Sequence, residues 1–214
     1  MPNWCYNFAT LNCPTKELYN KLLISLEENK MFETFAPLSE EPAEASEAID
    51  KWGTKWGPQD LEILCSYDDT FSVVVSFNTA WSPPLGVYKT MNTDFNIVID
   101  AYYDELGCEF FGRCFYENGE EVDDVYDLPS NLEELNELRK IIGKDLDEYM
   151  MSTWEQLEEQ WQNEEDEEDE EDEEDEEEDD DDDDCGNVEV VEVVEVVEVV
   201  EVGVEENESE TPNQ

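Results

Sequence analysis

Three short segments bring tryptophan together with residues that restrict or free the backbone. They are Met1–Asn7 (MPNWCYN), Trp52–Gly57 (WGTKWG) and Thr79–Pro84 (TAWSPP). Glycine and proline beside a large ring help to fix the direction in which it points. Aromatic rings beside a single ammonium group would suit a small ligand, a base or a peptide. The candidate binding residues are therefore Trp4, Asn7, Trp52, Lys55, Trp56 and Trp81.

Two other interpretations of these segments stay open. In a structural one, the tryptophans anchor loops and Lys55 pairs with a carboxylate. In an enzymatic one, removal of Met1 leaves Pro2 with a secondary amine, which burial could turn into a base or nucleophile next to Tyr6 and Lys55. The alternative to a binding module is thus a small-ligand-binding protein or an enzyme that uses Pro2, Lys55 and the tryptophans.

Most catalytic chemistry lacks its usual residues. The chain has no histidine, which excludes Ser–His and Cys–His nucleophile pairs and every histidine-containing zinc site. Its six cysteines form no C-x-x-C pair, and no P-loop or G-x-G-x-x-G segment is present. We therefore predict no catalytic residue, no metal site and no cofactor, and a binding module in preference to an enzyme.

The charge distribution points to basic partners. The formal net charge is −53, all ten basic residues lie at or before Lys144, and Glu164–Asp184 is an unbroken acidic run. Such a chain lacks the cations that bind nucleic acid and is repelled by anionic membranes, but it attracts basic proteins. No apolar stretch approaches the roughly 20 residues of a membrane span, and no signal peptide precedes Trp4. We predict that the acidic tail either binds basic proteins or only keeps the chain soluble. We also predict no direct nucleic acid binding, no membrane association and a cytoplasmic or other intracellular location.

Residues 1–127 show the pattern of an α+β domain. Aromatic and β-branched residues between turn signals predict strands at 3–13, 61–67, 70–78, 96–103 and 109–116. Helical spacing predicts helices at 16–30, capped by Thr15, and 85–95, with a loop or short helix at 37–50. Asn118-Gly119 is typical of a hairpin turn. The order βαββαβ plus an extra strand predicts a ferredoxin-like antiparallel sheet with helices on one face.

Residues 130–162 are predicted to form an amphipathic helical extension. Ser130 and Glu133 have the spacing of a capping box, and Gly143 is a point where the helix could divide. The apolar stripe from Leu135 to Trp161 must be covered. It could pack on the domain's own sheet or helices, form a homo-oligomer, or enter a partner's groove.

Residues 163–214 are predicted to be a disordered acidic low-complexity tail. Like charges four residues apart destabilise a helix. In Val188–Val202 glutamate recurs every third residue, which matches neither the strand period nor the helical one.

The three tryptophan segments, followed by Tyr103, Glu105, Gly107 and Phe110–Gly112, resemble the YubB-type ferredoxin-like domain family over about residues 1–117. That family is found on plasmids, in bacteria and in viral genomes. The resemblance implies a ferredoxin-like fold without an iron–sulfur cluster and a viral or mobile-element protein, which would include a virus-infected host cell among its locations. It implies no activity.

Overall fold

The computed structural model describes residues 3–39 and 45–177. Its strands are β1 (Trp4–Asn12), β2 (Gln59–Tyr67), β3 (Ser72–Ala80), β4 (Val98–Glu105), β5 (Phe110–Glu117) and β6 (Glu120–Asp127). Its helices are α1 (Lys16–Glu27), α2 (Met31–Phe35), α3 (Ala45–Trp52), α4 (Leu85–Phe95), α5 (Leu132–Ile141), α6 (Lys144–Tyr149) and α7 (Met151–Glu177). The chain divides into two compact units, Met1–Glu168 and Asp169–Gln214, and the contacts described below lie within the first.

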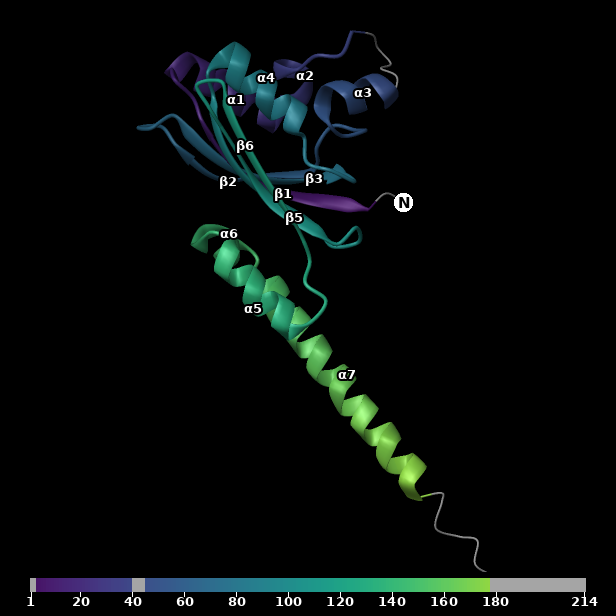
Figure 1. The fold of residues 1–214 in the computed structure, drawn as a ribbon. Coiled ribbons are helices and arrows are strands. Elements are labelled where there is room, and N and C mark those ends of the chain that lie inside the picture. The colour runs from purple at the N-terminus through teal and green to yellow at the C-terminus, as the bar shows by residue number, and fades with distance from the viewer. Residues whose placement is uncertain (1–2, 40–44, 178–214) are drawn as a thin grey trace, which may run out of the picture. The chain divides into compact units, whose positions relative to one another are not determined.

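All six strands form one antiparallel sheet in the order β2-β3-β1-β4-β5-β6. The four strands β2-β3-β1-β4, together with α1 and α4, have the ferredoxin-like arrangement, so the predicted α+β fold is confirmed. Figure 1 shows α1–α4 on one face of the sheet. None of the helices in residues 3–39 and 45–177 is long and apolar enough to cross a membrane.

The main core lies between the sheet and α1–α4. Strand β1 alternates, with Cys5, Asn7, Ala9 and Leu11 buried beneath these helices and the residues between them on the opposite face. Helix α1 begins as predicted, because the Thr15 side chain accepts a hydrogen bond from the backbone N–H of Leu18. The alternation gives the sheet a second face, on which Trp4 lies.

Strand β6 was not predicted. Five of its eight residues are acidic, and Val122 and Val125 are three residues apart, so the period-two pattern of a strand is missing. The turn before it was recognised: Asn118 and Gly119 both have positive φ, 52° and 83°, as a type I′ hairpin requires. This turn pairs the acidic segment with β5. A hairpin signal therefore specified the strand where composition did not.

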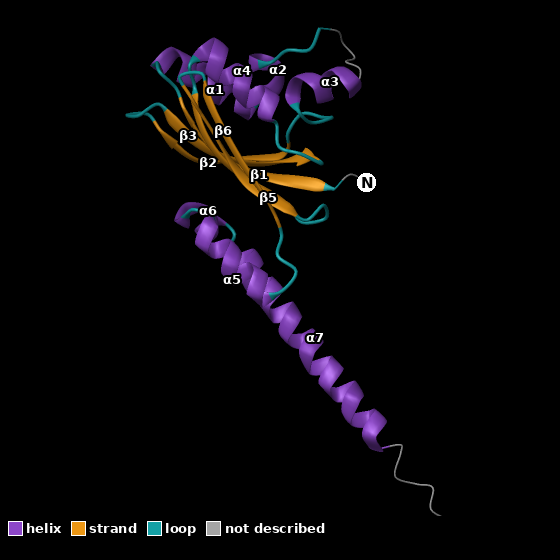
Figure 2. Cartoon of the chain, viewed as in Figure 1, coloured by secondary structure: helices purple, strands orange, loops and turns teal. Residues whose placement is uncertain are grey.

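The helical extension packs on the second face of the sheet. Phe111 of β5 is buried there with the apolar stripe of the extension, which includes Leu135, Leu146 and Trp154. The Phe111 ring lies 5.3 Å from that of Trp154, edge to face. Figure 2 shows α5 and α6 on the side of the sheet opposite α1–α4. Of the covers considered for the stripe, the structure shows the domain's own sheet.

The extension divides at Gly143, but the predicted capping box is wrong by one residue. Asn131, not Ser130, is the N-cap, and its side-chain oxygen accepts from the N–H of Glu134 at 2.9 Å. The Glu134 carboxylate in turn accepts from the N–H and hydroxyl of Ser130. These bonds lower the pKa of Glu134. Asparagine is as favourable an N-cap as serine, so by residue type either Ser130 or Asn131 could begin the helix.

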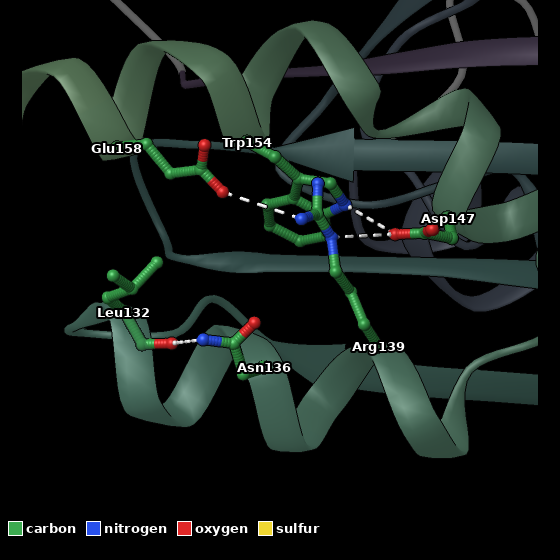
Figure 3. Close-up of polar contacts among 6 residues, drawn as sticks. All are labelled: Leu132, Asn136, Arg139, Asp147, Trp154 and Glu158. Atoms are coloured by element: carbon green, nitrogen blue, oxygen red, sulfur yellow. Dashed lines mark hydrogen bonds and ion pairs between the residues drawn. The ribbon is translucent and has the colours of Figure 1, made fainter.

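A polar cluster ties the helices of the extension to one another (Figure 3). The Arg139 guanidinium donates to Asp147 at 3.2 Å and to Glu158 at 3.4 Å. The Trp154 indole N–H donates to the same Asp147 oxygen at 3.0 Å. Asp147 thus connects α5, α6 and α7, so the indole is buried with its polar group satisfied.

Helix α7 continues to Glu177, whereas no helix was predicted beyond Asn163. Glutamate has a high helix propensity, and a helix already formed over Met151–Trp161 needs only to be extended. These two effects outweigh the repulsion on which the prediction depended. The rest of the predicted disordered tail, residues 178–214, lies outside the described residues.

Candidate functional site

Trp4, Trp56 and Trp81, together with Lys55, form what we call the tryptophan surface. The ring of Trp56 lies 6.3 Å from that of Trp4 and 5.8 Å from that of Trp81. The Lys55 ammonium lies 4.9 Å from the centre of the Trp56 ring and 5.5 Å from that of Trp81. The three tryptophans are 40–42% exposed. Four of the six predicted binding residues therefore lie together at the surface.

Hydrogen bonds beneath the surface hold the loop of Lys55 and Trp56 against the end of β3. The buried Thr54 hydroxyl donates to the carbonyl of Ala80 and accepts from its N–H, both at 3.0 Å. The Ser82 hydroxyl donates to the carbonyl of Gly53 at 2.5 Å. Gly53 has φ +85°, and a Cβ there would lie 3.2 Å from the Pro83 carbonyl oxygen. These hydrogen bonds thus connect the WGTKWG and TAWSPP segments.

Trp81 has an unusual backbone. Its φ is +66°, a left-handed conformation that is rare for a bulky residue. Its N–H donates to the carbonyl of Asn3 at 3.0 Å, which holds the chain beside β1. Backbone strain of this kind is found disproportionately at functional sites. The conformation places the Trp81 ring beside Trp56.

Asn7 lies beneath the tryptophan surface and is 1% exposed. Its amide nitrogen donates to the carbonyl of Cys5 and to the Thr79 hydroxyl, both at 2.9 Å. Its amide oxygen has no hydrogen-bond partner in the described part of the chain. Asn7 therefore joins the ends of β1 and β3, and it supports the surface without being part of it.

Trp52 is in the core and not at the surface. It is 5% exposed, its indole N–H donates to the carbonyl of Ala36 at 2.6 Å, and its ring lies 5.4 Å from that of Phe32. As the last residue of α3 it faces the other core residues of that layer. The sequence could not separate it from Trp56, because both flank the same glycine-containing turn. Pro2, the candidate nucleophile, lies outside the described residues.

Tyr6 was not among the predicted binding residues. It is two residues from Trp4 on the same face of β1 and is 40% exposed. Strand alternation could have identified it, because side chains two apart point to the same side. Tyr6 extends the exposed aromatic area toward β4, where it is opposite Asp104.

The later residues of the sequence motif have structural roles. The buried Glu105 accepts a hydrogen bond from the N–H of Gly107 at 3.0 Å. A Cβ at Gly112 would lie 2.6 Å from the Tyr103 hydroxyl, which donates to Asp123 at 2.6 Å. Gly112 thus leaves room for the tyrosine that ties β4 to β6. These residues maintain the sheet and add no reactive group to the tryptophan surface.

The tryptophan surface combines three indole rings with one ammonium group. Lys55 makes no ion pair within 4 Å in the part of the chain that the structure describes. Burial raises the pKa of Cys13 to about 12, and it also raises that of Cys5 behind the surface, so both thiols stay protonated at neutral pH. Among residues 3–39 and 45–177 no cluster of three acidic, cysteine or histidine residues could hold a metal ion.

A separate hollow of about 440 Å³ lies beside α7, lined by Leu128, Ser130, Gln156, Leu157 and Trp161 among others. Its one charged lining residue is Glu109. It has none of the candidate binding residues and no acid–base pair. The tryptophan surface is therefore the stronger candidate.

The comparison with protein families agrees with the fold. Residues 51–145 match the model of a family described as the ferredoxin-like domain in Api92-like protein. A solved structure, that of a protein api92 from Yersinia pseudotuberculosis, matches with 18% identity and a TM-score of 0.34, over 41% of this chain and 30% of that chain. The chain thus corresponds to less than a third of that protein's length. No curated protein matches.

Proposed function

We propose that the protein is a non-enzymatic binding module that contacts its partner through the tryptophan surface. The observation that carries the proposal is the row of three half-exposed tryptophans with the Lys55 ammonium over two of the rings. Tryptophan is enriched among the residues that dominate binding energy at protein interfaces. Exposed aromatic groups held in place by buried hydrogen bonds lose little conformational freedom on binding.

The geometry favours binding over catalysis at this surface. An enzyme of the kind considered from the sequence needs an acid, base or nucleophile within about 3 Å of a reacting atom. The described side chains of the surface are three indoles and an ammonium group that lies against two of them. The small-ligand alternative included Trp52, which is buried in the core and is not part of the tryptophan surface.

Trp56→Ala tests the proposal, with Tyr67→Ala as a matched control. Tyr67 is an aromatic residue of β2 that is 51% exposed and not part of the tryptophan surface. Full-length wild type and both variants would be compared in a quantitative affinity capture from the source cells. We expect partners to be retained by Tyr67→Ala and lost by Trp56→Ala with its fold intact. Capture that is equal for all three proteins would refute the proposal.

We also propose that the acidic run Glu164–Asp184 attracts basic proteins to the module. The support is its uniform charge, which steers oppositely charged molecules and is screened by salt. Capture at low and high salt, with the full chain and with a chain that ends at Asn163, separates the contributions. If the shortened chain retains every partner at every salt concentration, the run has no such role.

We further propose that the family is of the YubB type. The match to a ferredoxin-like domain family supports the coarser relationship. The finer one depends on the three tryptophan segments, two of which join beneath the tryptophan surface. A sequence comparison seeded with residues 1–117 would refute it if the recovered relatives lack these segments.

A further inference from the structure

We propose that the tryptophan surface recognises a lysine- or arginine-bearing segment of a basic protein, whose cationic group takes the place of the Lys55 ammonium. This inference depends on the proposed function, because it names the class of partner for the same surface. It assigns an occupant by the chemistry of the rings and of the groups around them.

The rings already bind a cation. The Lys55 ammonium lies within 6 Å of the centres of both the Trp56 and Trp81 rings, which is the range of a favourable cation–π interaction. Tryptophan is the best aromatic partner for such a group. The geometry for receiving an ammonium or guanidinium group is therefore present between these two rings.

Three carboxylates lie near the border of the tryptophan surface, each beside a residue that adjoins it. Glu33 lies beside Gly57, with its carboxylate oxygen 3.5 Å from the position of a Cβ there. Asp60 accepts a hydrogen bond from Asn78 at 3.3 Å, and Asp104 is opposite Tyr6 on β4. Lys55 is the one cation that contacts the rings in the described part of the chain. The border is complementary to a partner with several positive charges, and it repels an anionic one.

Lys55 then acts as a built-in competitor. While its ammonium occupies the two rings, a partner's cation must displace it and also overcome the repulsion between like charges. Replacing Lys55 by methionine removes the charge and keeps an apolar chain of similar length. The inference thus predicts tighter binding of a basic peptide by Lys55→Met, whereas a site for anions would lose its only cation and bind more weakly.

The test uses the full chain, labelled with ¹⁵N, and two short synthetic peptides in which glycine alternates with lysine or with glutamate. The indole N–H signals of Trp4, Trp56 and Trp81 report on the surface. Those of Trp52 and Trp154, which are buried, serve as internal controls. Binding of the lysine peptide to the acidic tail alone should not respond to Trp56→Ala or Lys55→Met, so these variants distinguish the two sites.

We expect the lysine peptide to shift the three surface signals and the glutamate peptide to leave them unchanged. Affinity measured from these shifts should rise about threefold in Lys55→Met and fall about threefold in Trp56→Ala. If the glutamate peptide shifts the signals, or if Lys55→Met weakens the lysine peptide, the inference is overturned.

The two proposals fail in different ways. If neither peptide moves the surface signals but Trp56→Ala still loses the captured partners, the partner class is wrong and the binding surface stands. If capture is also unchanged in Trp56→Ala, the proposed function itself fails and the inference fails with it.

Discussion

The sheet face opposite α1–α4 has two aromatic regions, of which one is covered by helices and the other is exposed. In one, Phe8 and Tyr102 contact Tyr149 of the helical extension, and Phe111, which stacks on Tyr126, contacts Trp154. In the other, Trp4, Tyr6, Trp56 and Trp81 are 40–42% exposed. Both regions are rich in large rings, so residue type does not separate them. They differ in whether the part of the chain that the structure describes covers them.

The difference shows in how polar groups are used. In the covered region, polar groups satisfy what the cover buries: Asp104 accepts from the Tyr149 hydroxyl at 2.5 Å and Asp147 accepts from the Trp154 indole. In the open region, Thr54, Asn7 and Ser82 form hydrogen bonds beneath the rings and fix their positions. One arrangement stabilises the fold. The other holds exposed rings in place.

Truncating one tryptophan in each region should lower stability to very different extents. Trp154→Ala removes a fully buried ring and should lower the free energy of unfolding by about 3–5 kcal/mol. Trp56→Ala removes a half-exposed ring, and its cost should be about 1 kcal/mol or less. Urea unfolding followed by circular dichroism measures both. Equally large losses would mean that the open region is a structural anchor, and equally small ones that the extension adds little stability.

Removing the N-cap of α5 should lower the free energy of unfolding by a smaller amount. Asn131→Ala removes the side chain that accepts from the N–H of Glu134 and should cost about 1 kcal/mol. Asn136→Ala is the matched control, because Asn136 is exposed and its amide donates to the Leu132 carbonyl within the same helix (Figure 3). Urea unfolding should separate them. A control that costs as much as the cap variant would contradict the role of Asn131.

Local signals predicted the four-stranded ferredoxin-like core and helix α4 with its bounds. Three features escaped because their causes are not local. Trp52 and Trp56 have similar neighbours in sequence, and only the packing of α3 buries one of them. The acidic β6 forms because a hairpin returns it to β5. The apolar stripe of the extension could have packed on several surfaces, and it packs on aromatic residues of the sheet.

The left-handed backbone of Trp81 allows a test of how much strain the open region carries. Trp81→Gly should relieve about 1 kcal/mol of left-handed strain, which offsets part of the loss of a half-exposed ring. Trp56→Gly has no positive φ to relieve, so it should be the less stable of the two variants. The difference in urea midpoint between them tests this. If Trp81→Gly is the less stable variant, the contacts of the Trp81 ring stabilise the fold by more than its backbone strain costs.

Asp104 lies at the boundary between the two regions, paired with Tyr6 on one side and hydrogen-bonded to Tyr149 on the other. Burial raises its pKa above the ordinary value of 3.8, and the Tyr149 hydroxyl opposes the shift only in part. An acid with a raised pKa in the folded state contributes most stability when protonated. That contribution is fully present below the ordinary pKa and is lost as pH rises through the folded one.

Asp104→Asn tests this, because the amide oxygen can still accept from Tyr149 but carries no charge. We expect the variant to gain stability relative to wild type as pH rises from the ordinary pKa of aspartate toward neutrality. Below that pKa the two proteins should converge. The chain has 63 acidic residues, so the informative quantity is the difference between the two unfolding free energies at each pH. A constant difference would mean that Asp104 is solvated like a surface carboxylate, and that the cover of the extension ends before it reaches the boundary.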